Sequence, residues 1–264
     1  MKPYLFTLLF LLTFYVFSQK KSQWKAVFQY HQIYTTKQKA RMDSLMKNDA
    51  FYRQMQGFAN QNIHNKTYVM FFDNKVSKFY QKYIDKDPNA SEFLNRKNFY
   101  LYLFKSYQRH QYMQDYEVLR VPFTVVDSLP DFHWKITGEQ KKIGQYKVIK
   151  ATGYEIRPIL KKGKIKEIKL NLIAWFCPDI PIPNGPELYG GLPGFIMELN
   201  TGKDLFLLKE LSRNPKKNAT IKPPEIYKQK GSFKSFLIER QKIYERFKKY
   251  RQNHRKTTKN WWQN

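Results

Sequence analysis

The chain has 264 residues, with 48 lysines and arginines against 21 aspartates and glutamates, a formal net charge of +27 and 42% hydrophobic residues. This length and apolar content suit a single domain with a sizeable core. The only cysteine, Cys177, excludes an intramolecular disulfide, so a packed core must stabilise the fold.

The first residues predict export. An apolar segment follows Lys2 and runs from Tyr4 to Phe17. It is too short to span a bilayer comfortably and has the length of a signal-peptide core, so we expect residues 1–18 to be a signal peptide cleaved after Ser18. An uncleaved anchor is the alternative. We expect no transmembrane span in the mature chain.

Export changes the meaning of the positive charge. In a cytoplasmic chain it would indicate nucleic acid, but a periplasmic or outer-membrane-associated protein meets none. The expected partner is therefore an outer-membrane protein or an apolar or anionic envelope ligand, such as a lipid, lipopolysaccharide or an acidic polymer. Because the basic residues are scattered through the whole chain, a general lysine bias with well-solvated side chains remains an alternative.

The first part of the mature chain mixes strands and helix. Glycine and proline are rare after the first strand, which favours helix there, and Asp73-Asn74 is a turn signal between two runs of strand formers. In chain order we expect a strand over 27–34, one or two helices over 36–62, a hairpin over 66–80, a polar connection over 85–98 and a strand over 99–104.

From Tyr116 the pattern becomes mainly β. Runs of β-branched and aromatic residues alternate with turn signals such as Ile143-Gly144 and Thr201-Gly202. The predicted strands are 118–126, 132–137, 146–154, 155–160, 165–177, 195–200 and 205–211, with Thr137-Gly138 and Lys162-Gly163 as further turns. The fold class is α+β and mainly β. We expect a curved antiparallel sheet or half-barrel over residues 19–225, with an N-terminal helical segment and a C-terminal amphipathic helix.

The C-terminal region is predicted to be a basic amphipathic helix over 226–251, followed by a disordered basic tail over 252–264. Ser232 is the expected N-cap, and Phe236, Ile243, Phe247 and Tyr250 recur at helical spacings. A membrane-surface or partner-binding helix is one interpretation. Packing on the sheet is favoured because the apolar face is narrow.

The sequence contains no recognisable catalytic constellation. The five histidines show no metal-ligand spacing, and neither a nucleophile elbow nor a phosphate-binding glycine loop is present. Cys177 has the context of a buried strand end. We therefore predict no catalytic residue, no metal and no cofactor, and favour a protein that is not an enzyme. An unrecognised hydrolase using Asp179 and Glu187 as acid and base is the weaker alternative.

One stretch, PNGPELYGGLPGF over 183–195, combines restrained prolines with permissive glycines. It predicts a tightly shaped loop that redirects the chain between two strands, with Leu192 in the core. The loop is either purely structural or also presents a shaped edge to a ligand or partner. The candidate binding residues are Trp175, Pro181, Gly185, Pro186, Gly191, Leu192, Pro193, Gly194 and Phe195.

The segment AWFCPDIPIPNGPELYGGLPGFIMEL, residues 174–199, resembles the signature of the GLPGLI family of exported Bacteroidetes proteins of unknown function. The segment 134–151 is similar to the region that precedes this signature, and the likeness extends loosely over about residues 65–210. Phe195 stands where the family usually has leucine, Cys177 where a small polar residue is common, and Val148 where a cysteine is frequent. The resemblance implies an envelope location and no particular chemistry.

Three functional hypotheses follow. The first is a non-enzymatic carrier or binding protein that engages an apolar ligand or envelope partner through the concave face of the sheet and the loop over 183–195. The second is an accessory interaction subunit of an outer-membrane, TonB-dependent receptor, docking through the basic terminal helix. The third is the hydrolase. An aromatic-lined cavity inside the sheet would favour the first hypothesis, and a solid interior would count against it.

Overall fold

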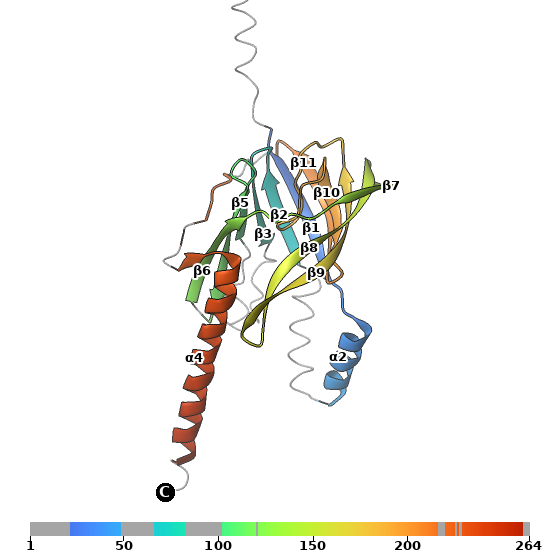
Figure 1. Cartoon of the computed structure of the whole chain (residues 1–264). Helices are drawn as coiled ribbons and strands as arrows, with labels where there is room; N and C mark the ends of the chain where they lie inside the picture. Colours follow the sequence, from blue (N-terminus) through green and yellow to red (C-terminus); the bar gives the residue numbers. More distant parts are fainter. Residues whose placement is uncertain are drawn as a thin grey trace, which may run out of the picture.

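The computed structural model describes residues 22–48, 66–82, 102–119, 121–215, 220–224, 226 and 229–260. The signal peptide expected at 1–18 and the polar connection expected at 85–98 lie outside these ranges. The described elements, shown in Figure 1, are β1 (Trp24–Gln32), α2 (Thr36–Asn48), β2 (Thr67–Phe72), β3 (Val76–Lys82), β4 (Tyr102–Ser106), β5 (Gln111–Val118), β6 (Val121–Ser128), β7 (Lys135–Ile143), β8 (Tyr146–Lys161), β9 (Lys164–Cys177), β10 (Phe195–Asn200), β11 (Asp204–Arg213), β12 (Lys230–Gly231) and α4 (Phe233–Asn260).

All described strands form one sheet in the order β12-β6-β5-β4-β3-β2-β1-β11-β10-β9-β8-β7. Neighbours are antiparallel except β12 and β6, which are parallel. The sheet is open, with β12 and β7 at its edges, and it curves around a central space (Figure 1). The predicted mainly β fold with a helix near each end is confirmed.

The core fills the concave face of this sheet. In β1, Ala26 and Phe28 are fully buried in the main core, whereas Val27 belongs to a small cluster on the opposite, outer face. This alternation is the period-two pattern of a strand with two distinct faces. Aromatic rings from distant strands meet inside, and Phe72 stacks on Phe195 with centroids 4.5 Å apart.

The first turns of α4 cross the opening between the two ends of the sheet. The helix contacts β6 and β8, which lie near opposite edges in the strand order. Ser232 caps it by accepting a hydrogen bond at Oγ from Ser235 N at 3.2 Å. Phe236 is buried and stacks on Tyr116 with centroids 4.2 Å apart. The predicted cap and the predicted packing on the sheet are both confirmed for these turns.

The rest of α4 runs away from the sheet (Figure 1). Phe247 and Tyr250 are 43% and 59% exposed, so the apolar face buries residues only near the start of the helix. We expected the helix to end at residue 251, followed by a disordered tail, but it continues to Asn260. The described residues include no helix that is both long and apolar enough to cross a membrane.

Several predicted boundaries were wrong. The strand expected over 118–126 is two strands, because the chain turns after Val118 at Leu119, whose φ is +49°. The strands expected over 146–154 and 155–160 are one long strand, β8, which pairs with β9 from Ile149 to Lys161. The turn expected at Thr137-Gly138 is a bulge inside β7, where the register shifts between Ile136 and Gln140.

Candidate functional site

The candidate site is built on residues 178–194, here called the Pro/Gly loop, which connects β9 to β10. These two strands pair directly, with Cys177 opposite Phe195, so the loop leaves and re-enters the sheet at neighbouring positions. It is tied to itself by backbone hydrogen bonds, including Phe195 N to Ile180 O at 3.0 Å and Gly191 N to Pro183 O at 3.1 Å. The loop is therefore a closed and compact unit.

Glycines permit close backbone approaches in this loop. A Cβ on Gly194 would lie 2.2 Å from the Cys177 carbonyl oxygen, and one on Gly190 would lie 2.7 Å from the Pro183 carbonyl oxygen. A Cβ on Gly185 would lie 2.7 Å from Cβ of Ile196. Gly191 is needed for a different reason, because its φ of +83° lies in the left-handed region.

The structure divides the nine predicted binding residues between core and surface. All nine lie on the Pro/Gly loop or its flanking strands, but their solvent exposure differs. Leu192 and Phe195 are core residues, as expected for Leu192. Gly185, Pro186 and Gly194 are also buried, Trp175 is partly exposed, and Pro181, Gly191 and Pro193 are exposed.

Lys105 on β4 anchors the loop from inside the sheet. Its side chain is fully buried, and Nζ donates hydrogen bonds to Gly185 O at 2.9 Å and Tyr189 O at 3.2 Å. Burial lowers the pKa of Lys105 well below its usual value, and the nearby charge of Glu187 opposes this shift. From the other side, the indole nitrogen of Trp134 donates to Gly190 O at 2.8 Å. The loop is thus held at both of its faces.

A charged network joins the loop to β8. Tyr189 OH donates to Glu155 Oε1 at 2.9 Å and accepts from an Arg157 guanidinium nitrogen at 2.8 Å. The same Arg157 nitrogen lies 2.6 Å from Glu155 Oε1. Burial raises the pKa of Tyr189, so its hydroxyl remains protonated and can donate. The three side chains satisfy one another in a partly buried triangle.

Glu187 differs from these neighbours. It adopts a φ of +49°, which is unfavourable for a non-glycine residue. No hydrogen bond or ion pair joins its carboxylate to any residue in the described ranges. Burial, followed by the charge of Asp204, raises the pKa of Glu187 to about 7, while Arg157 acts in the opposite direction. A strained, unpaired carboxylate inside a fold indicates a functional role.

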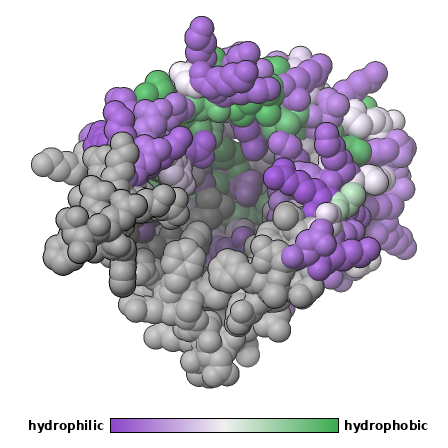
Figure 2. All heavy atoms as spheres, turned by 90° about the horizontal axis from the view of Figure 1, so that it is seen from below, coloured by the Kyte–Doolittle hydropathy of each residue, from purple (hydrophilic) through white to green (hydrophobic). Residues whose placement is uncertain are grey.

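Glu187 lines a cavity of about 550 Å³ inside the curve of the sheet. Side chains of β4, β5, β6 and β8, the Pro/Gly loop and the start of α4 surround this inner cavity. Its apolar wall includes Leu103, Tyr112, Tyr116, Leu188 and Phe233. Seen from below in Figure 2, the molecule contains a hollow that is hydrophobic in its depth and hydrophilic around its described rim.

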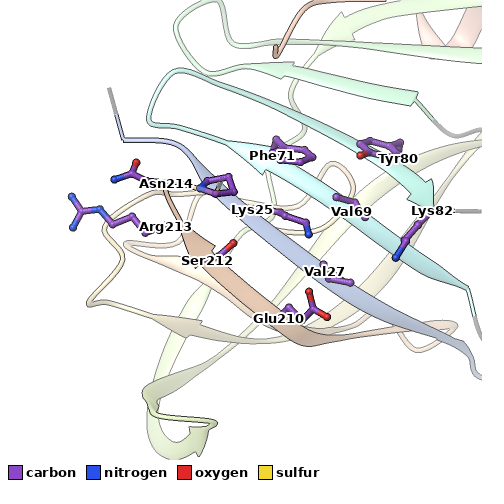
Figure 3. A pocket seen from close by; sticks show the side chains of 11 residues that line it. Lys25, Val27, Val69, Phe71, Tyr80, Lys82, Glu210, Ser212, Arg213 and Asn214 are labelled. Atoms are coloured by element: carbon purple, nitrogen blue, oxygen red, sulfur yellow. The ribbon is translucent and has the colours of Figure 1, made fainter. Parts of the chain in front are cut away.

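A second hollow, of about 680 Å³, lies on the outer face of the sheet. Figure 3 shows its side chains, among them Lys25, Val27, Phe71 and Glu210, projecting from one face of neighbouring strands. The floor of this outer groove is one face of the sheet, and among the described residues that line it Asn214 and Pro215 lie outside the strands, whereas six segments surround the inner cavity. We therefore favour the inner cavity as the binding site, although the outer groove is larger.

The structure does not bring together the two residues of the hydrolase hypothesis, Asp179 and Glu187. Asp179 is exposed and does not line the inner cavity, so it does not share that space with Glu187. Cys177 is fully buried, and burial raises the pKa of its thiol, which disfavours the nucleophilic thiolate. Within the described ranges, no group of three or more His, Cys, Asp or Glu side chains is placed to hold a metal ion.

The model of a family described as "Protein of unknown function (Porph_ging)", which is associated with Bacteroidetes, matches residues 159–198. The matched segment covers the end of β8, all of β9, the Pro/Gly loop and the start of β10. No curated protein and no solved structure matches the chain.

Sequence reasoning found the loop but missed most of the residues that give the site its chemistry. Lys105 lies one residue beyond a predicted strand, and nothing in YLFKS marks that lysine as buried. Glu155 and Arg157 alternate on β8 with one residue between them, which places both on one face of a strand. This spacing was the one signal in the sequence that could have predicted an interaction between the two side chains. Glu187 was named for its position near the loop, without an indication that it faces a cavity.

The closest backbone approach in the loop gives a first prediction. Gly194→Ala places a Cβ against the Cys177 carbonyl and should lower the free energy of unfolding by about 3 kcal/mol or more. Gly191→Ala, whose Cβ would make only an ordinary contact with Trp134 at 4.0 Å but whose φ is left-handed, should cost only about 1 kcal/mol. Urea denaturation of both variants tests this ordering, and equal losses would contradict it.

Lys105→Met should lower the free energy of unfolding by about 2–4 kcal/mol, because two buried carbonyl oxygens lose their donor. The exposed Lys209→Met on β11 is the matched control and should change stability by less than about 0.5 kcal/mol. The free energies of unfolding of both variants and of wild type, measured by urea denaturation, test this difference. A Lys105→Met variant as stable as the control would show that the ammonium does not hold the loop.

Glu187→Gln should stabilise the protein in a pH-dependent manner. The pKa of Glu187 is higher in the folded state, about 7, than the ordinary value of 4.5, so ionisation destabilises the fold as pH rises between these values. The variant should gain about 3 kcal/mol over wild type at pH 8 and almost nothing at pH 4. Thermal denaturation across this pH range measures the difference, and a pH-independent effect would contradict the assignment.

Proposed function

We propose that this protein is an exported carrier that binds an apolar ligand in its inner cavity, in the periplasm or at the outer membrane. The observation that carries the proposal is the cavity itself, with its aromatic and aliphatic walls inside a curved sheet. Apolar pockets of several hundred Å³ with a few placed polar groups are the usual form of small-molecule sites. The apolar segment at residues 4–17 supports export, and the GLPGLI-like signature supports an envelope location.

The walls of the cavity are suited to holding a ligand in place. Leu103 is 1% exposed and fixed in β4, and Tyr112 is 4% exposed in β5. The Pro/Gly loop contributes Leu188 from a segment that is pinned by Lys105 and Trp134. Burying about 200 Å² of apolar ligand surface against such walls contributes on the order of 5 kcal/mol before the losses of ordering. Preformed walls keep those losses small.

Binding accounts for the site better than catalysis does. Glu187 has a pKa suited to proton transfer, but within the described ranges no hydrogen bond or ion pair positions a second reactive group against its carboxylate. The neighbouring Glu155, Arg157 and Tyr189 are engaged with one another. An isolated carboxylate can recognise a ligand, whereas acid and base catalysis needs a second positioned group.

The proposal predicts saturable binding of an uncharged apolar probe. N-phenyl-1-naphthylamine should gain fluorescence on titration with the full mature chain. Leu188→Trp fills the inner cavity and should weaken this binding at least tenfold. Ser212→Trp places the same side chain in the outer groove and is the matched control, with unchanged binding.

The two variants separate the possible sites. Loss of binding in Ser212→Trp alone would move the site to the outer groove and overturn the assignment to the inner cavity. An absence of saturable binding in wild type would overturn the carrier function and favour docking on an outer-membrane receptor through α4.

A further inference from the structure

We propose that the inner cavity selects ligands that combine an apolar chain with a protonated amine, and that the Glu187 carboxylate is the counter-ion of that amine. This inference rests on the proposed carrier function and specifies its ligand class.

The charged groups that surround Glu187 are two further carboxylates and two basic side chains. Glu187 interacts electrostatically with Asp204 and Glu155, and with the cations of Arg157 and Lys105. Lys105 is fully buried, and its donors are directed at two backbone carbonyls. The remaining groups that interact with Glu187 are tyrosines of β1, β2, β5 and the loop, namely Tyr30, Tyr68, Tyr116 and Tyr189. Among the charged groups that act on one another around Glu187, three carboxylates therefore face two cations, although the net charge of the protein is strongly positive.

Every other carboxylate of this interior has a partner. Glu155 accepts from Tyr189 and pairs with Arg157. Asp127 accepts from the backbone nitrogen of Phe233 at 3.0 Å, at the start of α4. Asp204 accepts from the hydroxyl of Tyr30 at 2.8 Å. Glu187 is the exception among the carboxylates described around the cavity, so a ligand cation would complete its interactions without displacing an existing bond.

An anionic ligand finds a less favourable site. Arg157 already shares one guanidinium nitrogen with Glu155 at 2.6 Å and Tyr189 at 2.8 Å, so the Glu155 carboxylate partly neutralises its charge before an anionic ligand arrives. Such a ligand would also bring a second negative charge towards Glu187. Lys234 lines the cavity, but it is 58% exposed at the side chain and pairs with Glu167 on β9 at 3.3 Å. A solvated lysine at the rim provides weak selection for an anion.

Aromatic rings in the wall add to the preference for a cation. Tyr112, Tyr116 and Phe233 line the same cavity as Glu187. Ring faces attract ammonium groups, by about 0.5–2 kcal/mol when the cation is desolvated. The same rings pack well against a hydrocarbon chain. An alkylamine therefore satisfies both the apolar wall and the lone carboxylate.

Ligands that differ only in the head group test this selection. Decylamine, decanol and decanoate, each below its micelle concentration, would compete with N-phenyl-1-naphthylamine for the full mature chain at pH 8. Decylamine should bind at least tenfold more tightly than decanoate. Glu187→Gln should weaken decylamine binding at least tenfold and leave decanol unchanged. Glu210→Gln, which removes a carboxylate from the outer groove, is the matched control and should leave all three affinities unchanged.

A pH series provides an independent readout. Decylamine remains protonated from pH 8 to pH 5, whereas Glu187 becomes protonated, so the amine preference of wild type should fall over this range and that of Glu187→Gln should stay flat. Equal affinities for the three compounds, or tighter binding of decanoate, would overturn the amine selection while leaving the carrier function intact. Failure of the naphthyl probe and of all three decyl compounds to bind would overturn both.

Discussion

The inward fold of the Pro/Gly loop depends on the amino group of one buried lysine, Lys105. Lys105 connects β4 to two loop carbonyls that lie 80 and 84 residues away in sequence. Without this contact, Gly185 O and Tyr189 O would be buried acceptors lacking their donor, which is costly in a low-dielectric interior. Because the tie holds the loop against the concave face, Tyr189 reaches Glu155 and Glu187 reaches the inner cavity. The chemistry of the cavity is thus a consequence of how the loop is anchored.

The fold accepts unfavourable local features around this anchor. A lysine is buried, Glu187 occupies a left-handed backbone conformation, and its carboxylate lacks a partner among the described residues. Such features persist where surrounding packing over-determines them. Here the stacked rings of Phe72 and Phe195 fix the strand that follows the loop, and three close glycine contacts fix the loop itself. Stability from the core offsets the strain at the site.

Local signals in the sequence predicted local structure well. The hairpin over 66–80 turns at Asp73, whose carboxylate accepts from the backbone nitrogens of Lys75 and Val76, so its signal lies within four residues. The Ser232 cap is equally local. The burial of Lys105, in contrast, depends on hydrogen-bond partners in a distant loop. The sequence of β4 contains no periodicity or motif that predicts these partners. The same holds for Glu187, because the walls that surround it come from six segments.

The protein separates its charges between surface and interior. Basic residues outnumber acidic ones by 48 to 21 over the chain, whereas the inner cavity contains an unpaired carboxylate beside a buried lysine of lowered pKa. Surface cations attract anionic surfaces at long range, and salt screens that attraction beyond about 10 Å. A carboxylate inside a cavity acts only at contact, where the surroundings screen it less. Under the proposed function, surface charge would favour a location at an anionic envelope, while the cavity would independently favour a cationic ligand.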